Sequence, residues 1–530
     1  MHTKANLPEN KCSRVKIKGV NFMGSRERFF YEMTSLNPEV TGSCHLVTVH
    51  YPDGRKTNFA VDCGLYQEKT YNELNAKSFP FDCESIEFVL ITHNHADHMG
   101  RLPYLIKGGY KGKIYTTVET SRMMPIALRD SFKIGKEDAK KHDRKMPYEE
   151  SDMLEAITRM VSCKFKEVEY IDRNIKTTFF MNGHLLGASM ILVQISYPGE
   201  EDINIFFTGD YKPSNVFFDV EDVPRWVYKL PITIVAESTY GYMDTTEVKY
   251  HMEDDLEYAI KQGKTIVISV FAQGRAQEVL YMLKDMQKHG RLSKSVRIRL
   301  DGNLACAYTQ IYQTSELLIE CGKEDFLPEN FQYVNKENRE EVLMYQGQQI
   351  ILSTSGMMDH GPAQFYLEKF IERSNVLIYI PGYTSPDTLG YKLQNPKDGK
   401  VTINGKEYVM RAEVKTTNEC SSHAKADEII ELLQRFDHPL LILFNHGQKE
   451  VKKQLVARAE KEVHAKRIEI LGEHTFRISP YGYMKHMGAK LFVPKSKKQE
   501  EKNKENHQKK ENKVNKKFVK KFTRRAFNYY

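Results

Sequence analysis

The 530-residue chain has little of several features that mark particular classes of protein. No apolar run approaches the roughly 20 residues that a transmembrane helix needs, so we expect no membrane span. The opening stretch, MHTKANLPENKC, has no apolar core, and we therefore expect no secretory signal peptide. The eight cysteines are scattered and no two form a CxxC pair, which argues against a disulfide framework and against a cysteine-ligated metal. These absences favour a cytoplasmic protein with reduced thiols.

The positive charge of the chain is concentrated at one end. The net charge is +8, and the segment Lys495–Tyr530 contains 14 Lys and Arg against 4 Asp and Glu. The rest of the chain is therefore slightly acidic. Apolar residues make up 40% of the chain, and 530 residues exceed the size of one compact core, so we expect two or three folded units.

One short stretch carries most of the chemical information. Phe88–Arg101 has the sequence FVLITHNHADHMGR, in which an apolar run typical of a buried strand precedes His93, His95, Asp97 and His98. Side chains two residues apart on an extended segment point the same way, so His93 and His95 can share one cation. Asp97 and His98 lie beyond the strand, where a turn can direct them to a second cation. Imidazole and carboxylate suit zinc or a similar transition metal, and the alternative is a histidine-rich loop that arose by chance.

Three further candidate residues follow predicted strands. Asp62 follows the strand Asn58–Val61, His184 lies in a glycine-containing loop, and Asp210 follows the strand Ile203–Thr208. Each is weak evidence alone, because a buried Asp after a strand is usually a structural residue with satisfied hydrogen bonds. His184 and Asp210 gain weight together, because a metal site at one edge of a sheet takes ligands from several strand ends.

The later chain changes character. Predicted strands and helices alternate from Tyr242 to about Gln394, which indicates a parallel sheet with helices on both faces. We expect a separate α/β unit here, inserted into the first. The charged segment Asp130–Tyr170 is expected to be a solvated insertion that is helical around Ser151–Met160. Asn404-Gly405 predicts a hairpin in the returning part of the chain.

The order of these motifs resembles that of a known superfamily. HxHxDH at residues 93–98, followed by a lone His and a lone Asp at strand ends, is similar to the metallo-β-lactamase superfamily. Glu237 in AESTYG, His423 in SSHAKADEI and His446 in FNHGQ narrow the resemblance to its β-CASP branch, a group of nucleases acting on RNA or DNA. FAQGRAQEVL, STSGMM and GYTSPDTLG lie between these motifs. The chain looks closest to archaeal and bacterial ribonucleases related to the cleavage endonuclease of eukaryotic polyadenylation.

The resemblance implies an α/β fold, a metallo-β-lactamase αββα sandwich with an inserted β-CASP α/β domain. It divides the chain into four parts. Residues 1–241 and 395–493 would form the metallo-β-lactamase domain, residues 242–394 the β-CASP domain, and residues 494–530 a disordered basic tail.

The resemblance also implies two zinc ions and the residues around them. Asp62 would hydrogen-bond a ligand histidine. His423 would be the general acid that protonates the leaving alkoxide, and Glu237 would orient it; the alternatives are a helix-cap histidine and a surface acid. The implied ligands are His93, His95 and His184 for one ion, Asp97, His98 and His446 for the other, and Asp210 between them.

Substrate contacts are less clearly indicated. Arg275 lies between a predicted strand and a helix start, where a helix N-terminus adds hydrogen-bond donors for a phosphate, although a plain salt bridge is nearly as well supported. Ser355 and Gly356 lie on a loop of similar character.

The function that follows is a zinc-dependent ribonuclease that cuts single-stranded RNA internally, and from the 5′ end if the same site admits it. A pair of metal ions suits a phosphodiester, because it supplies a nucleophile at neutral pH and compensates the charge of the phosphoryl oxygens. The alternatives are a DNA nuclease of the same branch, a small-molecule hydrolase such as a thioesterase, and a non-catalytic scaffold. The sequence leaves the oligomeric state open, and a homodimer is compatible with it.

The tail Lys495–Tyr530 is of low complexity and has too few apolar residues to fold alone. Phenylalanines and tyrosines alternate with Lys and Arg towards its end, so rings could stack on bases while the cations follow the phosphates. We expect an auxiliary, sequence-neutral RNA-binding arm. A solvated tail without function and a docking segment for a protein or ribonucleoprotein partner are the alternatives.

Overall fold

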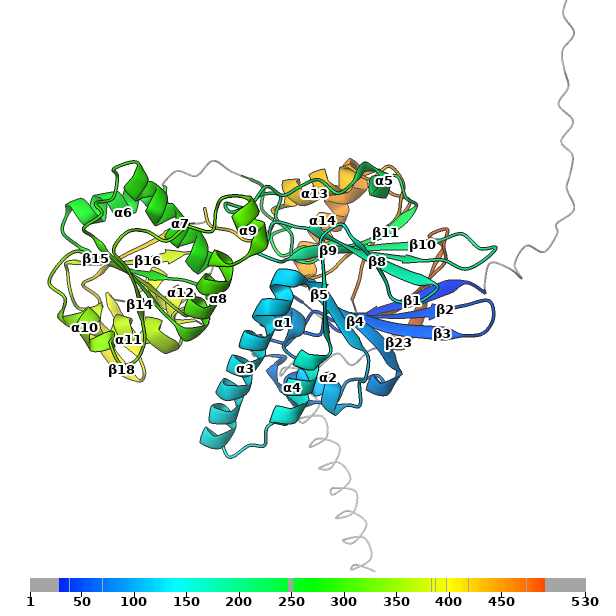
Figure 1. Cartoon of the computed structure of the whole chain (residues 1–530), viewed down its shortest axis with the longest axis horizontal. Coiled ribbons are helices and arrows are strands. Elements are labelled where there is room, and N and C mark those ends of the chain that lie inside the picture. The colour runs from blue at the N-terminus through cyan, green and yellow to red at the C-terminus, as the bar shows by residue number, and fades with distance from the viewer. Residues whose placement is uncertain are drawn as a thin grey trace, which may run out of the picture.

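The computed structural model describes residues 28–490, apart from Pro38, Lys69, residues 246–250, Tyr383, Asp387, Lys397, Asn418 and Glu473. Across these residues, no helix combines the length and the apolar character that a membrane crossing requires. The tail predicted for residues 494–530 lies outside the described residues. The described chain forms a two-sheet sandwich with a third, helix-covered sheet beside it (Figure 1).

Two sheets stack face to face in the sandwich, with the orders β23-β22-β1-β2-β3-β4-β5-β6 and β21-β20-β11-β10-β9-β8-β7. Apolar side chains such as Phe59, Leu90, Phe179 and Leu443 fill the space between them. The strands of the first sheet are β1 (Phe30–Ser35), β2 (His45–His50), β3 (Lys56–Val61), β4 (Ile86–Leu90), β5 (Lys113–Thr117), β6 (Met160–Cys163), β22 (His474–Ile478) and β23 (Met484–Lys490). Those of the second are β7 (Val168–Tyr170), β8 (Ile175–Met181), β9 (Ser189–Ile195), β10 (Ile203–Phe207), β11 (Ile232–Ala236), β20 (Pro439–Phe444) and β21 (Ile468–Ile470).

Helices cover the outer face of each sheet, because each strand alternates its apolar side chains between the inner core and an outer one. On the first sheet, Val89 and Ile114 pack against Leu102 and Met123 of the covering helices. These helices are α1 (Ala96–Met99), α2 (Leu102–Lys107), α3 (Val118–Lys141) and α4 (Glu150–Thr158), with 3-10 turns at Asn72–Ala76 and Cys83–Ser85. The second sheet is covered by α5 (Arg225–Tyr228), α13 (Ala426–Gln434) and α14 (Lys449–Glu462).

The third sheet is entirely parallel, with the order β14-β13-β15-β12-β16-β19. Its strands are β12 (Thr265–Ser269), β13 (Arg297–Asp301), β14 (Phe331–Val334), β15 (Gln349–Ser353), β16 (Val376–Pro381) and β19 (Glu413–Thr417). One face packs on α6 (Met252–Lys261), α7 (Arg275–Lys288), α8 (Asn303–Gln313) and α9 (Glu316–Glu320). The other packs on α10 (Arg339–Met344), α11 (Gly361–Phe370) and α12 (Leu389–Gln394). A four-layer αββα sandwich with a further α/β unit confirms the predicted fold class.

The third sheet extends beyond the predicted boundary at Gln394. β19 is the edge strand of this sheet and pairs in parallel with β16. The predicted turn at Asn404-Gly405 does join a hairpin, β17 (Lys400–Ile403) and β18 (Lys406–Val409), but this hairpin precedes β19. It therefore belongs to the α/β unit and not to the return into the sandwich.

The segment Asp130–Tyr170 also differs from its prediction as a solvated insertion. The predicted helix around Ser151–Met160 is present as α4, but the segment also contains the second half of α3 and the strands β6 and β7. Met153 and Ala156 of α4 are buried, and β6 pairs with β5 in the first sheet. The dense charges lie on the outer sides of α3 and α4, and they obscured the few apolar positions that attach these helices to the fold.

Five segments approach one edge of the sandwich because parallel neighbours end on the same side. β3 and β4 are parallel, and so are β10, β11 and β20. Asp62, the HxHxDH motif, Asp210, Glu237 and His446 follow these strands.

Candidate metal centre

The first group of predicted ligands comes from two separate loops. His93 and His95 follow β4, and their ring centres lie 4.8 Å apart. His184 enters from the loop between β8 and β9, and its Nε2 lies 3.1 Å from Nδ1 of His95. Oδ2 of Asp210 lies 3.5 Å from Nε2 of His93 and 3.7 Å from Nε2 of His184. One ligand atom from each of these four side chains lies within 4.8 Å of all the others.

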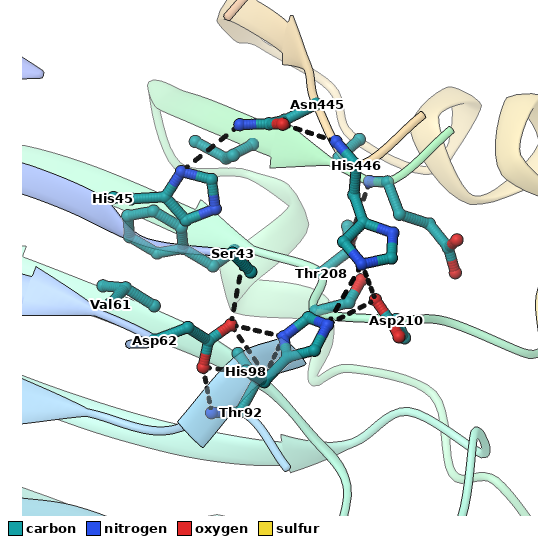
Figure 2. A pocket seen from close by; sticks show the side chains of 15 residues that line it. Ser43, His45, Val61, Asp62, Thr92, His98, Thr208, Asp210, Asn445 and His446 are labelled. Carbon is teal, nitrogen blue, oxygen red and sulfur yellow. Dashed lines mark hydrogen bonds and ion pairs between the residues drawn. The ribbon is translucent and has the colours of Figure 1, made fainter. Parts of the chain in front are cut away.

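The second group lies on the other side of Asp210. Nε2 of His98, on α1, lies 3.1 Å from Nε2 of His446, which follows β20. Oδ2 of Asp97 lies 4.0 Å from the first of these nitrogens and 3.7 Å from the second. Oδ1 of Asp210 lies 3.2 Å from Nε2 of His98 and 3.4 Å from Nε2 of His446. Figure 2 shows Asp210 beside His98 and His446 in the pocket that they line.

The protonation of the first group suits metal binding. Burial lowers the pKa of His93 and His184 well below 6.5, and lowers that of His95 to about 4, so these imidazoles are neutral near pH 7. Neutral imidazole is the form that binds zinc. Nε2 of His93 is buried and has no hydrogen-bond partner, which is the state expected of an atom that a cation would satisfy.

The second group carries excess negative charge. Burial would raise the pKa of Asp97, but the neighbouring imidazole of His446 and the charge of His98 outweigh burial and lower it to about 2. Burial disfavours charge on His98, yet Asp210 and Asp62 raise its pKa well above the usual value. Buried carboxylates need a positive charge nearby. The donor set, with nitrogen and carboxylate oxygen in two adjoining groups, fits a pair of zinc ions.

Two of the imidazoles, those of His98 and His184, are fixed through the nitrogen that faces away from the cluster. Oδ2 of Asp62 lies 2.7 Å from Nδ1 of His98, and since a carboxylate only accepts, this Nδ1 carries a proton. The carbonyl of Ser422 accepts from Nδ1 of His184 at 2.7 Å. Such contacts fix the tautomer and direct the other nitrogen towards a metal.

Two threonines hold further ligands, and the sequence analysis did not identify them. Oγ1 of Thr92 lies 3.0 Å from Nδ1 of His93 and also hydrogen-bonds Asp62. Oγ1 of Thr239 lies 2.9 Å from Nδ1 of His446. Their position was the signal in the sequence that could have identified them, because Thr92 directly precedes the HxHxDH motif and Thr239 lies within AESTYG. Serine and threonine are common throughout the chain, so position alone did not single them out.

His423 and Glu237 form a pair beside the two groups. Nδ1 of His423 lies 2.9 Å from Oε2 of Glu237, whose other oxygen accepts from the backbone N–H of Tyr211. Burial disfavours charge on His423, but Glu237 and Asp210 outweigh it and raise the pKa to about 9. Nε2 of His423 lies 4.0 Å from Oδ2 of Asp210. The imidazole therefore carries a proton at the edge of the cluster.

The residues that the sequence predicted to contact the substrate lie in surroundings that differ from one another. Arg275 is only 5% exposed, and its guanidinium contacts Glu278 and Ser422, which agrees with the predicted alternative of a salt bridge. Burial was not visible in the sequence, because the loop that covers Arg275 is more than 140 residues away. Ser355 and Gly356 follow β15, and Gly356 lies directly against the ring of Phe271.

Family profiles and known proteins match large parts of the chain. Three family profiles match the chain: the metallo-beta-lactamase superfamily over residues 38–159, the Beta-Casp domain over residues 276–393, and a Zn-dependent metallo-hydrolase RNA specificity domain over residues 407–471. The transcription termination factor FttA of Methanosarcina mazei is 30% identical over 454 residues, which cover 80% of this chain and 68% of that protein.

Two relatives from other lineages are similar over comparable lengths. Ribonuclease TTHA0252 of Thermus thermophilus is 30% identical over 78% of this chain and 91% of its own length. Endoribonuclease ysh1 of Schizosaccharomyces pombe is 26% identical over 82% of this chain and 56% of its own length. Across four archaeal FttA proteins, the matched region covers 63–68% of the relative.

Proposed function

Because this chain belongs to the β-CASP branch of the metallo-β-lactamase superfamily, we propose that it is a zinc-dependent ribonuclease that hydrolyses phosphodiester bonds of single-stranded RNA. The observation that carries the proposal is the pair of ligand groups that share Asp210, with a protonated His423 beside them. A metal pair and a separate proton donor are what hydrolysis of a phosphodiester requires.

We assign the ligands according to the two groups. His93, His95 and His184 would hold one zinc ion, Asp97, His98 and His446 the other, and Asp210 would serve both. When bound, the zinc pair supplies a nucleophile at neutral pH and offsets the negative charge on the phosphoryl oxygens. Asp62 keeps the Nδ1 proton of His98 in place, so that Nε2 of His98 is available as a ligand.

His423 is the proposed general acid. Its Nδ1–H is held by Glu237, which leaves the proton on Nε2 directed to the cluster edge, 4.0 Å from Asp210. A leaving alkoxide needs a proton in the transition state, and a positioned imidazolium can donate it. Glu237 would stabilise the charged imidazole and fix its orientation. Its second oxygen, held by the N–H of Tyr211, prevents the carboxylate from turning away.

RNA is favoured over DNA by the relatives and by the profile over residues 407–471, which is described as an RNA specificity domain. We propose internal cleavage, with 5′-exonucleolytic cleavage at the same site, in RNA processing or decay. Hydroxide attack makes no use of the 2′-OH, so a DNA nuclease is the alternative. A non-catalytic RNA-binding scaffold is less well supported, because every ligand position is filled. We further propose that RNA phosphates contact Ser355 and Gly356, at the carboxyl edge of the third sheet.

The central experiment incubates zinc-loaded protein with end-labelled RNA and DNA of one sequence and maps the ends of the products. The proposal expects RNA fragments with 5′-phosphate and 3′-hydroxyl ends, and no such fragments from the Asp97→Ala variant. Cleavage of DNA alone would favour the alternative nuclease. Tight RNA binding without cleavage by the zinc-loaded protein would favour the scaffold.

Three further features belong to the same proposal. The basic aromatic tail, residues 494–530, would add a sequence-neutral RNA contact, and its removal after Val493 should reduce the dependence of RNA affinity on salt. Equal dependence on salt for the full-length and the shortened protein would exclude that role.

A cytoplasmic location is supported by the cysteines, since all those within the described residues are free thiols. A homodimer is tested by sedimentation of the full-length protein at several concentrations.

A further inference from the structure

One short turn of the third sheet's unit touches three separate segments of the metal centre. The turn Gln273–Arg275 joins β12 to α7. Oε1 of Gln273 accepts from the side chain of Asn94, the residue between ligands His93 and His95, at 2.9 Å. A methyl group on Gly274 would lie 3.7 Å from Cβ of Leu185, which follows the ligand His184.

Arg275 makes the third of these contacts. Its Nη2 donates to Oγ of Ser422 at 3.2 Å, and its Nη1 donates to Glu278 at 3.1 Å. Its Nε is buried and has no hydrogen-bond partner. Burying a guanidinium costs free energy unless its N–H groups are paired. Arg275 has few such partners in the described structure, so each of them matters for holding the side chain in place. The Ser422 hydroxyl is one of them.

Ser422 connects Arg275 to two side chains of the site. Its carbonyl accepts the proton on Nδ1 of His184 at 2.7 Å, and the next residue is His423. The side chain of Lys212 donates to the neighbouring carbonyl of Ser421 at 2.5 Å. Two cationic side chains therefore hold this loop from different units. Lys212, from the sandwich, binds the backbone at Ser421, and Arg275, from the third sheet's unit, binds the hydroxyl of Ser422.

We propose that Arg275 is a positioning residue for the metal centre, acting through Ser422. By holding Ser422, it fixes the carbonyl that orients the imidazole of His184 and the backbone from which His423 extends. This inference rests on the proposed ribonuclease function for its rate effect, but not for its effect on metal binding. It assigns the third sheet's unit a part in assembling the metal centre, separate from any contact with RNA.

The test compares Arg275→Met, Ser422→Ala and the double variant with Arg122→Met. Arg122 is the matched control, because it also joins the two units, through Thr314 at 2.7 and 3.0 Å, away from the metal centre. Zinc affinity is measured by titration, and the visible spectrum of the cobalt-substituted protein reports the geometry of the ligands. RNA cleavage is resolved into kcat and KM, and RNA affinity is measured against salt concentration.

Arg275→Met should weaken zinc binding and lower kcat about 10- to 100-fold, as is typical when a partner of a ligand is removed, with KM and the salt slope unchanged. The cobalt spectrum should change. Ser422→Ala should act in the same direction, and the double variant should be no worse than the stronger single one, because both remove one linkage. Ser422→Ala keeps the backbone and decides the question if Arg275→Met does not fold.

Other outcomes would overturn the inference. Unchanged zinc affinity and kcat, with weaker RNA binding and a salt slope lower by about 0.7, would make Arg275 a phosphate contact. If Arg122→Met loses as much zinc affinity and kcat as Arg275→Met, the effect of Arg275→Met is general destabilisation. A wild-type protein that binds zinc but leaves RNA intact would defeat the proposed function alone, because zinc affinity and the cobalt spectrum would still test Arg275.

Discussion

Nδ1 of His423 lies 2.9 Å from Oε2 of Glu237, and both side chains come from segments far apart in the chain. β11 ends at Ala236, directly before Glu237, whereas His423 precedes α13. The carboxylate raises the pKa of the imidazole above its usual value despite burial, so the pair is built to hold a proton. His423 is not one of the proposed ligands, so we expect its replacement to separate proton donation from metal binding.

His423→Ala should retain zinc and lose cleavage by about 10²- to 10⁴-fold, the usual contribution of a general acid. Zinc content by elemental analysis and single-turnover cleavage of labelled RNA measure the two effects. Glu237→Gln keeps the size of the side chain but removes its charge, and we expect a smaller loss. In the double variant the rate should fall no further than in His423→Ala. Full activity of His423→Ala would remove it from this role.

Asp210→Asn should abolish cleavage and bring zinc content well below two ions per chain. The reason is that the two oxygens of Asp210 face different ligand groups, and an amide can present only one oxygen. Asp219→Asn, an exposed carboxylate in the segment that follows, is the matched control and should be unaffected. Zinc binding at full stoichiometry in Asp210→Asn would contradict the shared position of this residue.

Asp62→Asn should weaken zinc binding about 10- to 100-fold, because Asp62 fixes the tautomer of His98 without touching a metal. Asparagine is the suitable replacement, since Asp62 has φ of +63° and asparagine tolerates the left-handed region. A competitive titration with a zinc-binding dye gives the affinity. If added zinc does not restore cleavage in Asp62→Asn, the residue does more than support His98.

Removal of zinc should destabilise the fold as well as stop cleavage. A ligand that binds only the folded state adds about 2.7 kcal/mol per site at 100 times its Kd, and here it also neutralises buried carboxylates. Thermal unfolding followed by circular dichroism, before and after chelation, measures the change. We expect a lower Tm in the chelated protein and recovery on addition of zinc, with magnesium as the control that does not restore it. An unchanged Tm would indicate that the folded protein does not depend on a bound metal.

Local patterns in the sequence were sufficient for the parts of the protein that short-range geometry controls. The ligands of the HxHxDH motif lie within six residues, so their chemistry is visible without a fold, and the alternation of strands and helices predicts a parallel sheet from periodicity alone. His184 and Asp210 were predicted because each follows a strand, and strand ends meet at a sheet edge. Asp62 was predicted from the resemblance to the family.

The tertiary structure decided what depends on contacts between distant segments. Parallel pairing of β11 and β20 is what brings His446 to the metal centre, and pairing of β16 and β19 extends the third sheet past its predicted boundary. The burial of Arg275 against Ser422, 147 residues away, is a contact that the sequence did not predict. Such pairings carry no local signal, because the free energy that stabilises them comes from surfaces that meet only when the whole chain has folded.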